Sequence, residues 1–424
     1  MAITYTATSN PGGLTGTALD GLPIEVTGLT LGTPYTFTVT ATDELESAAS
    51  AASASVTPIV YVAPLWAWGQ NYWGQLGDGT VINRSSPVQV GSGTKWLNVS
   101  QGASLTIAKK TDGTLWAWGH NGDGRLGLGD TVSRSSPVQI GTGAGWSKIA
   151  AAAGFASAIK TDGTLWSWGV NYWWQLGDGT SINKSSPVQI SALTNWSKIS
   201  TKAYHTHGLK KDGSLWSWGF NGQGQLGSNG SLTDPTPGIY RVGTETTWLN
   251  VSCGLRHSIA TKSDGTLWTW GFNQYYVLGY GGVMSKIIPG QVGYGATWLN
   301  VCAIAYTNFA TKTDGTLWAW GNNNDGQCGF GFIDRGPNGQ ARTINEPTQV
   351  GTGTNWSKIF GGDGHVFATK TDGTLWAWGV NTAGQLGDGT VIDRLGPVQI
   401  GALTTWLDAV VSAGGENTVR ITKI

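Results

Sequence analysis

The chain has 424 residues with 25 basic and 25 acidic side chains, so its formal net charge is zero, and only 12% of its residues are charged. This balance argues against a nucleic-acid or membrane surface built on bulk electrostatics, and no run of eighteen apolar residues predicts a membrane-spanning helix. The 66 glycines fall at turn positions between short runs rich in Trp, Val, Ile and Thr, a pattern typical of an all-β protein.

Residues 1–58 contain no Trp and are rich in Thr and Ala. Alternating runs predict strands at residues 3–9, 24–29 and 35–42, with a weaker fourth run ending at residues 56–58. The stretch from Val26 to Asp43 resembles the second half of a fibronectin type III domain. The resemblance implies that Tyr35 forms a tyrosine corner, its hydroxyl bonding back to upstream backbone.

The first two strands of such a sandwich are absent from residues 1–58, although the family fold needs about seven strands. An incomplete sheet leaves an edge unpaired, so we expect another protein chain, or another copy of this one, to complete it by strand addition. The alternative is a partly ordered arm. We therefore divide the chain into a docking segment, residues 1–58, that is a partial β-sandwich, and a second domain, residues 59–424.

The second domain is built on the phrase Leu-Trp-X-Trp-Gly, which occurs seven times at spacings of 50 to 58 residues. The copies begin at Leu65, Leu115, Leu165, Leu215, Leu267, Leu317 and Leu375. An Asp-Gly pair precedes six of them, which predicts a two-residue type I′ hairpin. Four short strand candidates per unit and seven units predict a seven-bladed β-propeller.

The two ends of the domain complement each other. The first unit begins directly at residues 64–69 without the two strands that precede this phrase elsewhere, and the chain finishes with two strand-like runs, residues 406–411 and 417–424. The sequence therefore predicts that the N- and C-terminal strands share one blade and close the ring, which would remove exposed sheet edges.

Three phrases, at residues 162–169, 175–180 and 253–260, resemble the repeats of the regulator of chromosome condensation family, and the resemblance covers residues 60–424. It implies a seven-bladed propeller whose activities range from guanine-nucleotide exchange on a small GTPase to chromatin binding and protein scaffolding. Exchange in that family depends on a wedge inserted in one blade, and chromatin binding on a basic tail. Units two and three show no insertion, and residues 1–58 carry no basic tail.

No convergent catalytic set, cofactor motif or metal site is predicted. His205, His257 and His365 occupy one repeat position on three blades, which spreads them around a ring instead of gathering them on one ion. The segment from Asn121 to Asp130 looks like a calcium loop but has Val132 where the closing Glu belongs. Three cysteines, without a C-x-x-C pair, predict buried thiols. We expect no enzyme activity.

One loop position departs from the repeat. After the recurring Asn, blades one, three and five carry aromatic residues where the other blades have small or polar ones. These residues are Tyr72, Trp73, Tyr172, Trp173, Trp174, Tyr275 and Tyr276. Exposed aromatic clusters are typical of binding surfaces, so we interpret them as a rim that binds a glycan or a protein receptor. The alternative is packing against the loop of the next blade.

The sequence thus predicts a non-enzymatic binding or structural module, displayed in a larger assembly such as a phage virion or a bacterial surface protein. Its expected location is a virion or the extracellular surface. The alternative is a cytoplasmic, intracellular protein-interaction regulator of a small GTPase.

Overall fold

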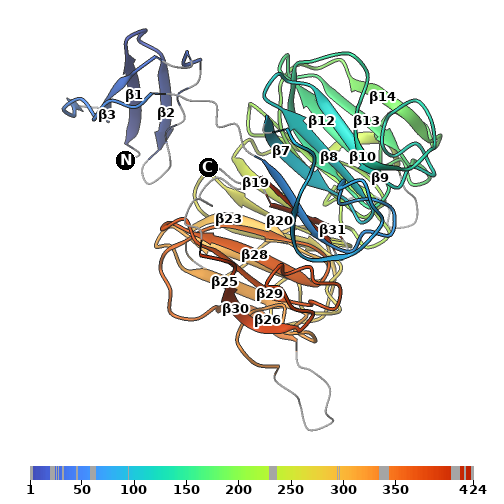
Figure 1. The fold of residues 1–424 in the computed structure, drawn as a ribbon. Helices are drawn as coiled ribbons and strands as arrows, with labels where there is room; N and C mark the ends of the chain where they lie inside the picture. The colour runs from blue at the N-terminus through green and yellow to red at the C-terminus, as the bar shows by residue number, and fades with distance from the viewer. Residues whose placement is uncertain are drawn as a thin grey trace. The chain divides into compact units, whose positions relative to one another are not determined.

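The computed structural model describes residues 3–19, 24, 26, 28–30, 33–43, 46–57, 64–93, 95–228, 236–293, 295, 297–333, 343–402, 411–414 and 417–421, with only the backbone at 18–19, 236–237, 411–414 and 417–421. Every regular element in these residues is a β-strand, and the chain divides into two compact units, residues 1–61 and 62–424 (Figure 1). No helix that could cross a membrane occurs in the described part of the chain.

The first unit is one antiparallel sheet in the order β2-β1-β3-β4. Its strands are β1 (Thr4–Asn10), β2 (Thr15–Leu19), β3 (Thr36–Thr42) and β4 (Ser47–Ala49). The backbone N–H of Thr30 donates to the Tyr35 hydroxyl oxygen, 2.9 Å away, as the tyrosine-corner resemblance implied. The described residues of this unit form a single sheet. A fibronectin type III domain has two packed sheets, so the expected partial β-sandwich is not observed in these residues.

Two expectations for this unit differ from the structure. β2 was not predicted, because its sequence Thr-Gly-Thr-Ala-Leu is weakly apolar; it pairs with β1 since Gly12 and Gly13 turn the chain back with φ of 95° and 59°. The described residues between 24 and 29 are not in a strand, and residues 25 and 27 lie outside the described part. Val56, at the end of the weak fourth run, forms an isolated bridge with Tyr35.

The second unit consists of seven four-stranded antiparallel sheets among its described residues. Six of them are formed by four strands consecutive in sequence: β7 (Trp96–Gln101), β8 (Leu105–Lys110), β9 (Leu115–Gly119) and β10 (Arg134–Gln139); β11 (Trp146–Ala151), β12 (Phe155–Lys160), β13 (Leu165–Gly169) and β14 (Lys184–Ser191); β15 (Trp196–Lys202), β16 (His205–Lys210), β17 (Leu215–Gly219) and β18 (Thr236–Arg241); β19 (Trp248–Cys253), β20 (His257–Lys262), β21 (Leu267–Gly271) and β22 (Lys286–Gln291); β23 (Trp298–Ala303), β24 (Thr307–Lys312), β25 (Leu317–Gly321) and β26 (Ile344–Gln349); β27 (Trp356–Gly361), β28 (His365–Lys370), β29 (Leu375–Gly379) and β30 (Arg394–Gln399). The first strands of these six sheets line one common cavity of about 490 Å³, the radial arrangement of a β-propeller.

The remaining sheet joins the two ends of the unit. Its order is β31-β32-β5-β6, formed by β31 (Val411–Gly414), β32 (Asn417–Ile421), β5 (Leu65–Gly69) and β6 (Arg84–Gln89). β32 pairs antiparallel with β5 over five residues, with Asn417 opposite Gly69 and Ile421 opposite Leu65. The expected strand at residues 406–411 lies outside the described residues except for Val411, where β31 begins.

The hairpins between second and third strands are not the expected type I′ turns. At the first of them Gly113 N–H donates to the Lys110 carbonyl oxygen and Lys110 N–H to that of Thr114, and Gly113 has φ of 79° while Asp112 does not have positive φ. This is a three-residue loop, a type I turn followed by a glycine bulge. The Asp112 carboxylate accepts from the Thr114 backbone N–H at 2.9 Å, so Asp stabilises the turn without needing a left-handed backbone.

The second Trp of each Leu-Trp-X-Trp-Gly strand forms the core between sheets. These seven indoles are 0–1% exposed. The Trp118 indole N–H donates to the Gln75 carbonyl oxygen at 3.0 Å, and the equivalent Trp270 donates to that of Gln225 at 2.9 Å. Each bond joins a strand to the loop of the preceding sheet, so the repeated phrase holds neighbouring sheets together.

Candidate functional site

The loops that follow the Leu-Trp-X-Trp-Gly strands are fixed by the recurring Asn. Asn71 is fully buried; its side-chain oxygen accepts from Leu76 N–H at 2.9 Å and its amide donates to the Thr80 carbonyl oxygen at 3.1 Å. Asn171 makes the same contacts with Leu176 and Thr180. The Asn therefore bonds local backbone, and residues placed next to it stand on a rigid support.

Four of the predicted rim aromatics are exposed on these loops. Tyr72 and Tyr172 are 65% and 60% exposed, and Trp73 and Trp173 are 49% and 40% exposed. Each of these two indoles also contacts the adjacent sheet: Trp73 lies 4.1 Å from the ring of His120, and Trp173 lies 5.1 Å from Phe220. Trp73 and Trp173 therefore each expose part of the indole ring to solvent and pack the rest against the loop of the neighbouring sheet.

Tyr275 takes part in a third cluster, whose rings come from two sheets. It is partly buried and lies 4.8 Å from Tyr306, which precedes β24, and 6.2 Å from Phe272, which follows β21. The three aromatic loops thus form separate clusters, each across a boundary between sheets. Sequence reasoning missed His120 and Phe220, although both stand directly before the recurring Asn.

The other two predicted residues, Trp174 and Tyr276, have a strained backbone. Their φ angles are 55° and 58°, at the loop position that is glycine in the other five loops, for example Gly74 with φ of 75°. A Cβ added at Gly74 would come within 2.5 Å of the Ser135 Cα in the adjacent sheet. Positive φ is uncommon and costly for such bulky side chains, so these two loops keep a conformation that glycine would adopt more easily.

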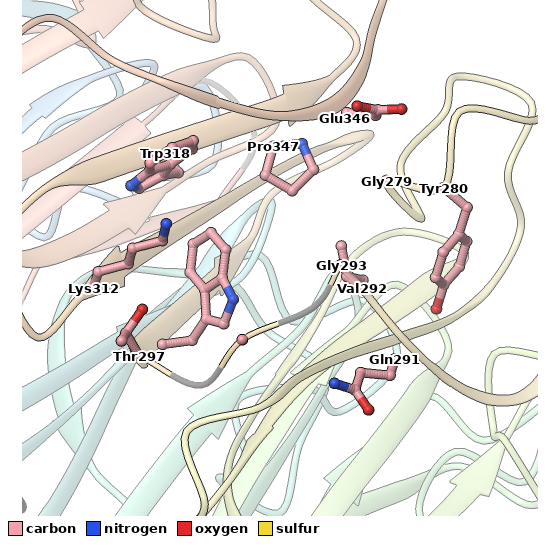
Figure 2. Close-up of a pocket in the computed structure, with 12 residues that line it drawn as sticks. Gly279, Tyr280, Gln291, Val292, Gly293, Thr297, Lys312, Trp318, Glu346 and Pro347 are labelled. Atoms are coloured by element: carbon pink, nitrogen blue, oxygen red, sulfur yellow. The ribbon is translucent and has the colours of Figure 1, made fainter.

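A second candidate site is a groove of about 750 Å³ beside β24 and β25. Figure 2 shows Lys312 and Trp318 on one side, Tyr280 and Gln291 on the other, and Glu346 and Pro347 above. The Lys312 ammonium nitrogen lies 3.9 Å from the ring centre of Trp318 and 4.7 Å from that of Trp298. This groove was not predicted from the sequence.

The histidines of the equivalent position, His205, His257 and His365, are fully buried. Burial lowers the pKa of His257 to about 4 despite its contact with Asn308 and holds the pKa of His205 well below its ordinary value, so these two side chains are neutral at pH 7. The three histidines lie on three different sheets, as predicted from the sequence. A different group of buried side chains was not predicted.

That group consists of His205, His207 and Cys253, whose ligand atoms lie within 4.8 Å of one another. His207 and Cys253 come from different repeats, so their proximity could not be predicted from the sequence. In the structure the Nε2 atoms of both histidines contact the Ser258 hydroxyl at 3.3 and 2.9 Å, and burial raises the pKa of the Cys253 thiol to about 12. The described side chains form a neutral hydrogen-bonded network.

Comparison with known families decides the classification. Residues 145–424, well over half of the chain, match the family model described as the RCC1-like domain. The chain belongs to the RCC1-like domain family. Residues 64–108 and 112–159 match the regulator of chromosome condensation (RCC1) repeat, as the resemblance of the repeats indicated.

The RCC1-like domain is similar in sequence to parts of larger proteins. It is 29% identical over 175 residues to the ultraviolet-B receptor UVR8 of Arabidopsis thaliana, covering 41% of this chain and 38% of that protein. It is 26% identical over 189 residues to the probable E3 ubiquitin-protein ligase HERC3 of Homo sapiens, covering 44% of this chain and 13% of that protein. The chain therefore spans less than two fifths of the length of either relative.

Solved structures agree with the fold. Prp20p from Saccharomyces cerevisiae, described together with its binding properties to Gsp1p and histones, superposes with a TM-score of 0.75 at 21% identity, over 86% of this chain and 92% of that chain. Human WBSCR16 gives a TM-score of 0.73 at 19% identity, over 85% and 99%. At these identities the similarity shows the propeller fold alone.

Proposed function

We propose that this RCC1-like domain is a non-enzymatic protein-binding module whose contact surface is the aromatic rim. The observation that carries the proposal is the exposure of Tyr72, Trp73, Tyr172 and Trp173 on loops held by the buried Asn71 and Asn171. Exposed aromatic rings on a rigid support give a large contact area with little loss of side-chain entropy on binding.

Backbone strain in the neighbouring positions favours the same proposal. Trp174 and Tyr276 hold bulky side chains at φ of 55° and 58°, which costs on the order of 1–3 kcal/mol each. Glycine would avoid that cost, so the presence of large aromatic rings is better explained by a use for the rings than by the requirements of the turn.

We further propose that the seven sheets form one closed ring of seven blades. The support is the antiparallel pairing of β32 with β5 together with a contact between the first and last repeats, in which the Trp68 indole N–H donates to the Gln385 carbonyl oxygen at 2.9 Å. A closed ring leaves only short, protected sheet edges and fixes all seven rim loops relative to one another, as a binding surface requires.

For the N-terminal unit we propose a docking role. Its sheet ends at β2 and β4, and another chain, or another copy of this one, could add a strand to β2. Deleting residues 2–58 tests this role: it should change the assembly state or solubility, and unchanged assembly and solubility would contradict it.

The rim proposal is tested with two double variants and one set of binding assays. Tyr72→Ser/Tyr172→Ser removes the exposed rings, and Ile82→Ser/Ile182→Ser is the matched control, since these residues lie on the same loops and are 59% and 64% exposed. Both variants should melt like the parent protein. In affinity capture from the source cells, the first should lose a protein partner that the control retains.

A glycan array with the same variants separates the two ligand classes. Binding of a glycan that depends on Tyr72 and Tyr172 would replace the protein partner in the proposal. Identical capture and identical array profiles for both variants and the parent would show that the rim is packing between loops and not a binding surface.

A second candidate is regulation of a small GTPase. A Caenorhabditis elegans relative, 27% identical over 139 residues that cover 33% of this chain and 6% of that protein, is named the X-linked retinitis pigmentosa GTPase regulator homolog. The structure of Prp20p is described with its binding to Gsp1p. A nucleotide-release assay with a small GTPase of the source cells tests this candidate.

The setting expected from the sequence, a phage virion or a bacterial surface, finds no support in these relatives. Their names are those of a receptor, a ligase and a GTPase regulator homolog. We therefore base the proposal on protein binding, with the intracellular regulator as the favoured setting.

A further inference from the structure

Among the described residues, six sheets repeat one arrangement, in which a lysine lies between two indoles. We call it a lysine clasp. The lysine ends the second strand, the nearer indole is the first Trp of Leu-Trp-X-Trp-Gly, and the farther indole begins the first strand. The six lysines are Lys110, Lys160, Lys210, Lys262, Lys312 and Lys370, each 3.5–4.0 Å from the nearer ring centre.

One clasp is closed by a carboxylate of the chain itself. The Glu245 carboxylate lies 2.6 Å from the Lys262 ammonium nitrogen, and Lys262 is only 5% exposed. Glu245 stands three residues before Trp248, in the loop between β18 and β19. An acidic side chain therefore fits the space above a lysine clasp and bonds its cation.

The residue type at the loop position equivalent to Glu245 differs between sheets, and the exposed fraction of the clasp lysine differs with it. Three residues before the clasp Trp there is glycine at Gly93, Gly143, Gly295 and Gly353, where Lys110, Lys160, Lys312 and Lys370 remain partly exposed. Leu193 and Glu245 occupy the position in the other two, where Lys210 and Lys262 are 6% and 5% exposed. A glycine thus leaves the clasp open to a side chain from elsewhere.

Of the two clasps that border a groove among the described residues, the clasp of Lys312 has the larger groove. The groove at Lys312 has about 750 Å³, against about 260 Å³ for the equivalent groove at Lys160. Trp298 is partly exposed, whereas the equivalent Trp146 is 6% exposed. In the described part of the chain neither Lys312 nor Glu346 forms an ion pair.

We propose that the groove at Lys312 binds an acidic side chain of a protein partner, which takes the place that Glu245 occupies above Lys262. The ligand carboxylate lies against Lys312 with Trp298 and Trp318 as walls, where the indoles exclude water and strengthen the charge-assisted hydrogen bond. The exposed Glu346, which lies above the groove in Figure 2, repels a second carboxylate, so the groove selects a single acidic residue flanked by neutral or basic ones.

A peptide is the occupant that the groove favours over a free carboxylate. Thr297 lines the groove near Lys312 and Gln291 lines it on the other side, and both side chains can donate to and accept from the backbone of a bound segment. The precedent within the chain is also a peptide, since Glu245 reaches Lys262 from the loop Gly-Thr-Glu-Thr-Thr at residues 243–247. These residues are distinct from the aromatic rim, so the two proposals stand independently.

The test uses a synthetic peptide with the sequence of residues 243–247 as the ligand. The full chain is labelled with 15N at the tryptophan indoles, and the NMR signals of Trp298 and Trp318 are assigned with Trp→Phe variants. The capped peptide Gly-Thr-Glu-Thr-Thr is then titrated to about 10 mM, a range that detects millimolar affinity. These two signals should shift with saturation. The same peptide with Gln in place of Glu should bind about tenfold more weakly, because it has no charge to place against Lys312.

Two variants complete the experiment. Lys312→Met should abolish the peptide-induced shifts but leave the indole signals of the other clasps in place, which verifies that the variant is folded. Lys262→Met changes the closed clasp and should leave peptide binding at Lys312 unchanged. Glu245→Gln should make the signals of Trp248 and Trp268 respond to the Glu peptide. The proposal is overturned if Lys312→Met retains binding, if the Gln peptide binds equally well, or if neither peptide shifts Trp298 and Trp318.

Discussion

The indole N–H of Trp68 donates a hydrogen bond to the carbonyl oxygen of Gln385, 2.9 Å away and 317 residues later in the chain. Four pairs of consecutive sheets make the same bond among the described residues, as Trp118 does with Gln75 at 3.0 Å. A Cβ added at Gly384 would come within 2.4 Å of the Ser85 Cα, close to the value of 2.5 Å for Gly74 and Ser135. The first and last repeats therefore contact each other as neighbouring sheets do.

Replacing Trp68 with Phe should lower the free energy of unfolding by more than the same change at Trp168. Both indoles are buried to the same extent, so the loss of apolar contact is matched. The indole N–H of Trp168 has no hydrogen-bond partner among the described residues, whereas Trp68→Phe removes the hydrogen bond from the indole N–H to the Gln385 carbonyl oxygen. The difference should be about 1 kcal/mol, measured by urea unfolding. Equal losses would show that the bond between the ends contributes nothing.

Removing residues 417–424 should destabilise the propeller far more than a point substitution, whose usual cost is about 0.5–3 kcal/mol. The deletion removes β32, which pairs with β5 over five residues, and leaves β5 as an exposed edge. The melting temperature and the tendency to aggregate are the measurements. Deleting only residues 422–424 is the control, because β32 then remains whole. A truncated protein that melts like the control would contradict the role of β32 in joining the ends.

Much of the fold could be predicted because the same apolar pattern occurs in all seven repeats. The indole of the second Trp is buried in every copy, so one apolar phrase defines the third strand of each sheet. The turn type was wrong for a local reason: Asp112 and Gly113 look like the two central residues of a type I′ turn, but Thr111 joins the loop and Asp112 keeps a negative φ. Backbone hydrogen bonds decide this, and composition does not reveal them.

The candidate sites could be predicted only in part. The aromatic loops were found because they break the repeat, but the sequence gives no sign that Trp174 and Tyr276 would have φ of 55° and 58°. The groove at Lys312 was missed because it depends on a side chain that is lacking at Gly295, which attracts no notice in a chain with 66 glycines. The proximity of His207 and Cys253 depends on the packing of two sheets, which a single sequence does not show.

Replacing Thr266 with Val should cost about 1 kcal/mol in unfolding free energy, because it removes two hydrogen bonds at one hairpin. The Thr266 hydroxyl donates to the Asp264 carboxylate at 2.6 Å and accepts from the Trp268 indole N–H at 2.8 Å. Thr266→Ser is the matched control and should retain nearly all the stability, because Ser214 makes both contacts in another hairpin. Urea unfolding of the two variants measures the difference, and equal stability of the Val and Ser variants would rule out a contribution from this hydroxyl.

Acid should destabilise the propeller between pH 6.5 and 4 through its buried histidines. Burial lowers the pKa of His207 and of His257 to about 4, while an unfolded histidine has a pKa of about 6.5. The unfolded chain therefore binds more protons as the pH falls below 6.5, and the loss of stability levels off once the folded histidines are protonated too, below pH 4. Lowering the pH from 7 to 5 should cost about 2 kcal/mol for each of these two histidines.

The variant His257→Gln isolates one of these contributions. Gln keeps a polar side chain that can reach Asn308, which contacts His257 Nε2 at 2.9 Å, but it does not titrate. Urea midpoints measured at pH 7 and pH 5 should show that the acid-induced loss is about 2 kcal/mol smaller in the variant than in the parent protein. A loss of the same size in both proteins would mean that His257 does not carry the acid sensitivity, and that the folded state accepts its proton without penalty.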